Sequence, residues 1–440
     1  MAEGGRGPAE VRDTAPILPA GRSRVFVAVA LLVAFVIRAV LAIRIGDTYR
    51  PLTDAADFDR LAASLASGHG WPATAVPAAV GPTAFRAPLY PALLGVVYRV
   101  AGVHHYTAAL LANAVVGTIV VALIAVVATQ LWGRRVGAVA LCIAAVHPTL
   151  MLYGTSLQLE PLLEALLLAA LAAALQHRRS LHELRWATAA GVCTGLAILT
   201  REIGFALIIP VCWLVWTGRP PPGRTVAAPF VALVAAAVIV VPWTARNAVT
   251  LHAFEPVSTS LGVGLAGVFD ATSFHNHANP ALWIPPWTDP AMGRIMLDHP
   301  DTTEVQVDNE LTRAAVDFLA AHPTYFGTVI FWNTIRLFDL NGTSGALFAA
   351  RYVPYPRRLT EAAVYMSYLL DALALVGLAL GVTRGVPRVI WLVPVLAWLA
   401  IVLLSGNIRY RASIEPFTVL LAAAGAVALT DRLRHESRLR

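Results

Sequence analysis

The sequence predicts an all-α polytopic membrane protein with about ten transmembrane helices. Three observations support this fold class. The chain of 440 residues is 58% hydrophobic and only 13% charged, whereas soluble domains are usually about a quarter charged. Its mean hydropathy is +0.66. Apolar runs recur along the whole chain at about the 20-residue length of a helix that crosses the hydrocarbon core.

These runs predict the transmembrane spans in order. We place a cytoplasmic tail at residues 1–24, one transmembrane domain at 25–430 and a second cytoplasmic tail at 431–440. The first run is long for a signal peptide and lacks a clear cleavage site, so we interpret it as a span. The predicted spans are Val25–Ile45, Tyr106–Leu131, Val136–Leu152, Leu157–Leu175, Trp186–Leu199, Phe205–Trp216, Val226–Val241, Ala362–Leu380, Val389–Leu404 and Phe417–Leu429.

Two of these spans are short for a full crossing. Trp186–Leu199 and Phe205–Trp216 are either parts of longer tilted helices or together one bent hairpin, so the count is uncertain by about two. The loops that follow every second span are short and contain arginine, as cytoplasmic loops do. They carry Arg134/Arg135, Arg178/Arg179/Arg185, Arg219/Arg224 and Arg384/Arg388. Both termini are therefore predicted to be cytoplasmic.

The same topology places two long polar segments outside the cell membrane. We call residues 46–105 the first outer segment and residues 242–361 the second outer segment. The second contains an amphipathic stretch, Val305–Leu319, followed by Tyr325–Phe338, and these are predicted to lie along the membrane surface. Functional side chains are expected in the outer segments and the short outer loops.

Several function classes receive no support from the sequence. The basic residues are spread between apolar runs instead of forming one face, so nucleic-acid binding is not indicated. Three cysteines lie in apolar runs without metal or redox spacing. His275-x-His277 resembles a metal-binding pattern, but such a pair in a polar loop is more often solvent-exposed. We therefore assign no metal ligand and no required cofactor, although a divalent metal remains compatible with the chemistry.

Charged residues recur at predicted outer helix ends. Asp54 and Asp57 open a predicted interfacial helix, where capping or solvation is an equally good explanation on physical grounds. Arg86 follows on a rigid turn, and a lone boundary arginine often reaches for lipid phosphates. Further candidates follow the third span and occupy the remaining outer loops: Glu160, Arg201, Arg246 and Arg409.

Together these residues gather acids and arginines on one side of the membrane. Arginine binds phosphate through paired hydrogen bonds, and a carboxylate can take a proton from a hydroxyl. A bound phosphate-sugar would require both kinds of group.

A series of motifs runs through the same loops in this order: Asp54…Phe58, Leu61-Ala62, Gly68-x-Gly70, Arg86-x-Pro88-Leu89-Tyr90-Pro91, Glu160, Thr200-Arg201, Pro242-Trp243…Arg246-Asn247 and Arg409-Tyr410-Arg411. The series resembles the GT-C glycosyltransferases. More narrowly, it is similar to their family-39 relatives, which include protein O-mannosyltransferases and the lipid A aminoarabinose transferase. The resemblance covers Val25–Gly264 and Asn407–Pro416, and the Arg-x-Pro-Leu-Tyr-Pro element is its most specific part.

The resemblance implies a transferase whose donor is a sugar on polyprenyl phosphate and whose acceptor is a hydroxyl outside the cell. It implies Asp54 as the catalytic residue, acting as a general base. Asp57 is the second candidate for this role, because many relatives have a second acid where this chain has Ala55. Glu160 matches a position that lines the family's active site. We assign donor-phosphate binding to Arg86, Arg201, Arg246 and Arg409, and substrate binding to Tyr90.

A transporter or flippase of lipid-linked sugars is the alternative function, and a non-catalytic scaffold ranks third. Transporters typically show repeated halves and ionisable groups at mid-membrane. Here no repeat is evident and the acids lie at outer helix ends. The sequence does not identify the sugar, the carrier length or the acceptor, which is a protein, a lipid or a cell-wall glycan.

Overall fold

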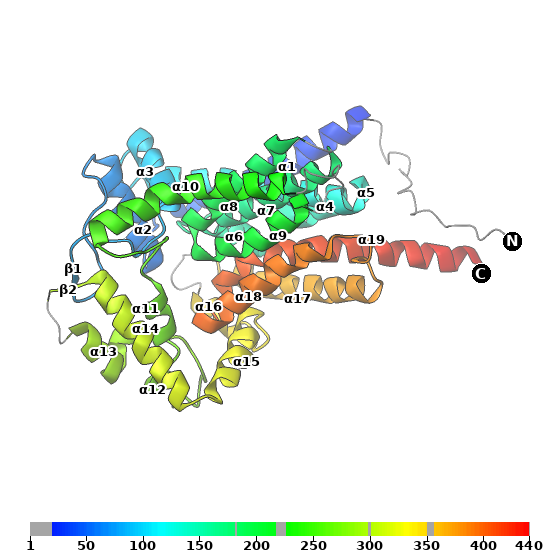
Figure 1. The fold of residues 1–440 in the computed structure, drawn as a ribbon. Coiled ribbons are helices and arrows are strands. Elements are labelled where there is room, and N and C mark those ends of the chain that lie inside the picture. The colour runs from blue at the N-terminus through cyan, green and yellow to red at the C-terminus, as the bar shows by residue number, and fades with distance from the viewer. Residues whose placement is uncertain (1–19, 181–182, 217–225, 298–300, 350–355, 440) are drawn as a thin grey trace.

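A computed structural model describes residues 20–180, 183–216, 226–297, 301–349 and 356–439. Most of the predicted N-terminal tail (1–24) lies outside these ranges, as does the predicted positive loop with Arg219 and Arg224. The described chain is mostly helical, and the predicted all-α polytopic membrane fold is confirmed. Long helices run side by side in a bundle, with the start of α1 (Ala20–Gly46) and the end of α19 (Glu415–Leu439) at one end of it (Figure 1).

Six helices of the described ranges are long and apolar enough to cross a membrane. They are α1 (Ala20–Gly46), α4 (Tyr106–Trp132), α7 (Glu160–Arg179), α10 (Ala227–Leu251), α17 (Arg357–Ala379) and α19 (Glu415–Leu439). Shorter bundle helices lie between them: α5 (Arg134–Val146), α6 (Pro148–Tyr153), α8 (Leu184–Thr200), η1 (Glu202–Leu207), α9 (Ile208–Trp216), η4 (Arg388–Trp391) and α18 (Leu392–Leu404). Every predicted span coincides with one or more of these helices.

Two predicted span boundaries are wrong, and proline accounts for both. The predicted span Val136–Leu152 is broken at His147, because Pro148 begins the separate helix α6. The predicted span Val226–Val241 instead continues through Pro242 to Leu251. Membrane helices tolerate an internal proline where neighbouring groups satisfy the freed backbone. Arg246 therefore belongs to the last turns of α10 and not to a loop.

Small residues allow the bundle helices to approach closely. A methyl group added at Gly191 of α8 would collide with the carbonyl of Ala232 in α10, and one added at Gly377 of α17 would meet Gly425 of α19. Because lipid offers no hydrophobic driving force between helices, such close packing is a main source of their association.

The outer segments gather at the end of the bundle away from the start of α1 and the end of α19 (Figure 1). The first contains α2 (Asp54–Ala66), β1 (Ala79–Val80) and α3 (Leu89–Ala101). The second contains α11 (Leu261–Ala266), α12 (Ala271–Phe274), η2 (Pro286–Thr288), α13 (Pro290–Leu297), β2 (Thr302–Thr303), α14 (Glu304–Ala321), α15 (Tyr325–Leu337) and α16 (Ser344–Ala349). The predicted amphipathic stretches correspond to α14 and α15.

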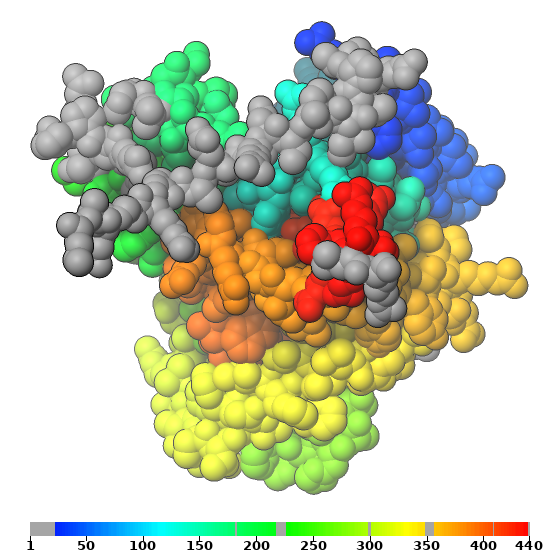
Figure 2. All heavy atoms as spheres, turned by 90° about the vertical axis from the view of Figure 1, so that its right-hand side faces the viewer, coloured from blue at the N-terminus to red at the C-terminus, as the bar shows by residue number. Residues whose placement is uncertain are grey.

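The two outer segments are joined to each other. Strand β1 pairs in parallel with β2, with Ala79 opposite Thr302 and Val80 opposite Thr303. Aromatic side chains form part of the core of the second segment, where Phe274 packs edge-on against Tyr325 at 5.0 Å between ring centroids. Viewed from the end where α19 emerges, the α14–α16 region projects to one side of the bundle (Figure 2).

The arrangement gives a test of orientation. In a variant lacking the native cysteines, single cysteines at Ala75 and Asn279 should react with an impermeant maleimide in intact cells, because both residues are exposed on the outer segments. A cysteine at Arg185, which is exposed near the start of α8, should react only after the cells are opened. The reverse pattern would place the outer segments in the cytoplasm.

Candidate functional site

Helix α2 presents its acids to arginines and does not use them as caps. Its N-cap residue, Thr53, makes no side-chain capping bond. Asp54 and Asp57 in the first turn instead face Arg86, while Asp59 points elsewhere and accepts a bond from the Tyr98 hydroxyl at 2.5 Å. The capping explanation for the first two acids is therefore not supported.

Arg86 lies on the turn between β1 and α3 and reaches both acids of α2. Its Nη2 atom is 2.6 Å from Asp54 Oδ1 and 2.8 Å from Asp57 Oδ2. Its Nε atom donates to the same Asp57 oxygen at 3.1 Å. The guanidinium also stacks over the ring of Phe85, 4.6 Å from its centroid. Two carboxylates and one aromatic face therefore fix its position.

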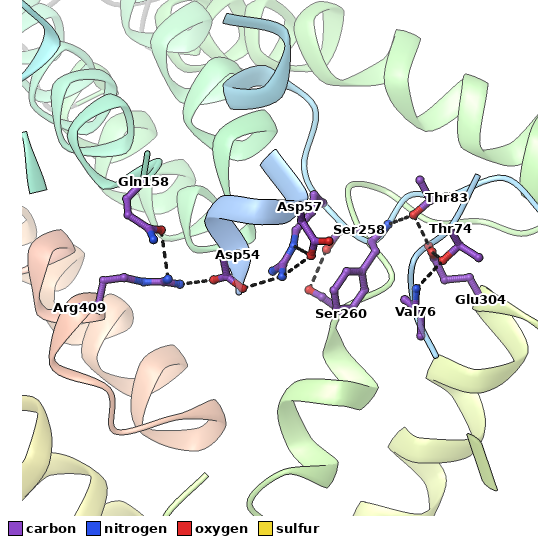
Figure 3. A network of polar contacts seen from close by, with 12 residues as sticks. Asp54, Asp57, Thr74, Val76, Thr83, Gln158, Ser258, Ser260, Glu304 and Arg409 are labelled. Carbon is purple, nitrogen blue, oxygen red and sulfur yellow. Dashed lines mark hydrogen bonds and ion pairs between the residues drawn. The ribbon is translucent and has the colours of Figure 1, made fainter. Parts of the chain in front are cut away.

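A second arginine joins α2 to the bundle. Arg409 belongs to η5 (Ile408–Ser413), the turn between α18 and α19. Its Nη2 atom donates to the second oxygen of Asp54, and its Nε atom is 2.9 Å from Glu160 Oε1. Its Nη1 atom donates to Gln158 Oε1 at 3.1 Å. Figure 3 shows this line of contacts from Gln158 through Arg409 to Asp54.

A third arginine completes the cluster. Arg201, at the end of α8, has its Nη1 atom 3.4 Å from Glu160 Oε1. It stacks on the ring of Tyr410 at 4.1 Å from the centroid, and Arg409 approaches the same ring at 4.9 Å. We call the three acids and three arginines joined by these contacts the outer cluster: Asp54, Asp57, Glu160, Arg86, Arg201 and Arg409.

The outer cluster is formally neutral, with three carboxylates and three guanidinium groups. Burial raises the pKa of Asp54, but Arg86 and Arg409 outweigh that effect and hold the pKa well below its usual range. Burial lowers the pKa of Arg409, but Asp54 and Glu160 raise it by a larger amount. The pKa therefore lies well above its ordinary value, and the guanidinium stays charged. The side chain of Glu160 is 1% exposed, whereas those of Arg86 and Arg201 are 21% and 25% exposed. Arg86 and Arg201 are therefore the two most exposed arginines of the cluster, since the side chain of Arg409 is 14% exposed.

Two of the predicted site residues lie outside the cluster. Arg246 donates to the carbonyl of Thr83 at 2.8 Å and stacks over Trp243. Tyr90 is buried, packs edge-on against Phe58 and accepts a bond from Asn113 Nδ2 at 3.0 Å. In the structure, Arg246 and Tyr90 contact the framework around the outer cluster, and their predicted binding of phosphate and substrate stays a prediction.

Other contributors were missed by the sequence analysis. Gln158 accepts a hydrogen bond from Arg409 and lies two residues before Glu160, which the motifs did identify. Tyr410 belongs to the motif Arg409-Tyr410-Arg411, but its contact with Arg201 was not predicted. Glu304 begins α14 and binds the segment that carries Arg86. The pattern Thr303-x-x-Gln306 is a capping box and marks a helix start there. Nothing in the sequence indicates which distant residues Glu304 contacts.

The comparisons with known proteins agree with the predicted fold. A family model described as dolichyl-phosphate-mannose-protein mannosyltransferase matches residues 85–245. No curated protein sequence matches the chain. The structure is similar to the archaeal oligosaccharyltransferase AglB from Archaeoglobus fulgidus in complex with an inhibitory peptide and a dolichol-phosphate, with a TM-score of 0.54 and 11% identity.

That match covers 93% of this chain but only 51% of AglB, so this chain spans about half the length of AglB. A second AglB structure, in complex with Zn and sulfate, has a TM-score of 0.51, with 12% identity over 91% of this chain and 50% of the other. ArnT from Cupriavidus metallidurans bound to undecaprenyl phosphate has a TM-score of 0.42 and 19% identity, covering 93% and 78% of the two chains. AglB is a GT-C glycosyltransferase, so the predicted GT-C resemblance is confirmed for the fold.

The acids of the outer cluster bind guanidinium groups: Asp54, Asp57 and Glu160 each have at least one carboxylate oxygen in an ion pair with an arginine. In the described ranges, no group of three or more His, Cys, Asp or Glu residues is placed to hold a metal ion.

The central pairing can be tested through stability. Replacing Arg409 with Leu should destabilise the protein by about 3 kcal/mol, because it leaves the buried charge of Glu160 poorly compensated. Adding Glu160→Gln to that variant should restore part of the loss. The measurement is thermal unfolding of the protein in detergent.

The matched control is Arg357→Ala, which breaks a pair whose arginine is 78% exposed. Exposed pairs contribute about 0–1 kcal/mol. Equal, small effects of both arginine substitutions would contradict a structural role for Arg409.

Proposed function

We propose that this chain is a membrane glycosyltransferase that moves a sugar from a polyprenyl-phosphate carrier to an acceptor hydroxyl at the outer face of the cell membrane. The outer cluster carries the proposal, since it combines phosphate-binding arginines with a carboxylate that can act as a base. The GT-C fold, the family model's description and the dolichol-phosphate in the AglB complex support it. The acceptor's chemical class stays open among protein, lipid and glycan.

Arginine is suited to the carrier's phosphate because its planar donors match phosphate oxygens in pairs. Arg86 and Arg201 are each partly exposed and approach the acids from different sides. Arg409 lies between Asp54 and Glu160, at the centre of the cluster. A phosphate that enters the cluster would therefore meet guanidinium groups that now bind carboxylates, and it would compete with those carboxylates for their hydrogen bonds.

The proposed reaction is a single displacement with inversion. The acceptor oxygen forms a bond to the anomeric carbon while the bond from that carbon to the phosphate oxygen breaks. The electron pair leaves with the polyprenyl phosphate, whose added negative charge the arginines stabilise. The acceptor's proton passes to Asp54. No strong general acid is needed, because the departing phosphate is stable as an anion.

Binding of the sugar donor also changes the pKa of Asp54. Two guanidinium groups keep the pKa of Asp54 low in the unliganded protein, so Asp54 is a weak base in that state. When phosphate oxygens take over donors of Arg86 or Arg409, that electrostatic effect weakens and the pKa of Asp54 rises. The carboxylate then becomes a better base only when a donor is present.

A transporter or flippase is the second candidate, and the buried ionisable residues of the bundle favour it. Arg38 of α1 and Glu164 of α7 are both buried within candidate spans, a position common in transport pathways. The discriminating observation is the product. A reconstituted transferase forms a new glycosidic bond, whereas a flippase moves the intact lipid-linked sugar across the bilayer.

The base can be tested by conservative substitutions. Asp54→Asn should lower turnover by about 10²–10⁴-fold, because the amide keeps the size but cannot take the proton. Donor binding should not weaken, because the substitution removes a carboxylate charge that competes with the phosphate for Arg86 and Arg409. Turnover should be measured with reconstituted protein, alongside Asp57→Asn and Glu160→Gln.

Full activity in Asp54→Asn with loss in Asp57→Asn would move the base by one helical turn. Full activity in all three variants would rule out the proposed mechanism.

The phosphate site can be tested at Arg86. Arg86→Ala should weaken binding of the lipid-phosphate donor by roughly 10–100-fold, since a charged hydrogen bond is worth about 1.5–3 kcal/mol. Arg50→Ala provides a control in the same outer segment, because Arg50 is exposed and binds only a neighbouring carbonyl in the described contacts. Unchanged donor affinity in Arg86→Ala would leave Arg86 only its structural role of pairing Asp54 and Asp57.

A further inference from the structure

Glu304, the first residue of α14, is a buried carboxylate outside the outer cluster. Its side chain accepts hydrogen bonds from four groups in the outer segments. Oε2 accepts from the hydroxyls of Thr74 at 2.5 Å and Thr83 at 2.6 Å. Oε1 accepts from the backbone amide of Ala84 at 2.8 Å and from the hydroxyl of Thr259. The residue is 2% exposed.

A buried carboxylate is costly unless several donors satisfy it. Here the donors come from two separate parts of the chain. Thr74, Thr83 and Ala84 belong to the first outer segment, whereas Thr259 follows α10 in the second. Figure 3 shows Glu304 between Thr74 and Thr83, on the far side of Asp57 from Arg409. One side chain therefore holds the two outer segments together, next to the β1–β2 pairing.

The same contacts fix the backbone that leads to Arg86. The hydroxyl of Thr83 accepts from the Phe85 amide at 3.0 Å, and the Thr83 carbonyl accepts from Arg246 at 2.8 Å. The Ala84 carbonyl accepts from the Thr259 amide at 3.2 Å. Polar contacts thus hold each residue of Thr83–Phe85, and the next residue in the chain is Arg86.

We propose that Glu304 is a positioning residue for the outer cluster: it fixes Thr83–Phe85 and so holds the Arg86 guanidinium where it meets Asp54, Asp57 and the donor phosphate. The phosphate part rests on the proposed function. Arg246 of α10 contributes to the same positioning, because it donates a hydrogen bond to the carbonyl of Thr83. None of the six residues of the outer cluster belongs to the second outer segment. Through Glu304, this segment nevertheless controls the geometry of the cluster.

The test compares Glu304→Gln with Asp308→Asn. Glutamine keeps the size of Glu304 but has one acceptor oxygen, and its NH₂ group faces donors that then lack a partner. Asp308 lies one turn later on α14, is also buried and accepts from the Gly262 amide at 2.6 Å. It ties α14 to α11 and in the described contacts does not touch the first outer segment, so Asp308→Asn is the matched control.

The first readout is hydrogen–deuterium exchange of the peptide covering residues 83–90 in the full-length protein in detergent. Glu304→Gln should speed exchange of the Ala84 and Phe85 amides at least tenfold, while Asp308→Asn leaves it unchanged. Thr83→Val, which removes one link without touching the carboxylate, should give a smaller increase. That variant keeps the test valid if Glu304→Gln does not fold.

The second readout is binding of undecaprenyl phosphate. Each substitution is measured in the wild-type chain and in the Arg86→Ala background. Glu304→Gln should weaken binding about tenfold in the wild-type chain but less than twofold further when Arg86 is already removed, because residues that act through one another are not additive. Asp308→Asn should change binding less than twofold in both backgrounds. A purely structural role would give the same loss in both backgrounds.

Unchanged exchange in both Glu304→Gln and Thr83→Val would overturn the proposal, and so would additive losses in the double variant. If exchange rises as expected but wild-type protein does not bind undecaprenyl phosphate, the proposed function fails and the positioning of Arg86 by Glu304 stands. The two readouts therefore separate the two claims.

Discussion

Arg409 binds Asp54 and Glu160 at the same time, and the rest of the site is arranged around this double pairing. The three residues come from α2, α7 and η5, which are far apart in the chain. A charge at the membrane boundary needs a partner, because the surrounding dielectric is low. The pairing therefore joins an outer helix to the end of the bundle. From two further elements, Arg86 pairs with Asp54 and Asp57, and Arg201 adds a second partner to Glu160.

The same rule governs charges deeper in the bundle. Glu415 of α19 lies 2.8 Å from His147 Nε2 and 2.5 Å from Arg411 Nε, and Arg411 also binds Asp371 of α17 at 2.9 Å. Arg38 donates to carbonyls of Ala34 and Ala145, beside Gly117 and Gly154, where a Cβ would lie 3.2 Å from its Nε. Buried charge pairs thus add specific contacts between helices that also share an apolar core.

The sequence was sufficient for the helices and for the gathering of charged residues at one end of the bundle, because apolar length and the order of acids and arginines along the chain can be read directly. It was insufficient where a residue's direction depends on distant packing. The resemblance assigns Arg246 to the phosphate, but only the structure shows that α10 continues past Pro242 and that Arg246 binds the carbonyl of Thr83. The partners of Tyr90 and Glu304 could not be predicted from the sequence for the same reason, since they lie far away in the chain and meet only in the folded protein.

Arg409 follows Asp54 by 355 positions. A chain synthesised only as far as α10 already contains Arg86 and Arg201, which pair with Asp54, Asp57 and Glu160. It still lacks Arg409, so the three carboxylates of the cluster face only two guanidinium groups. The cluster therefore reaches its charge balance only when synthesis has passed η5, between α18 and α19.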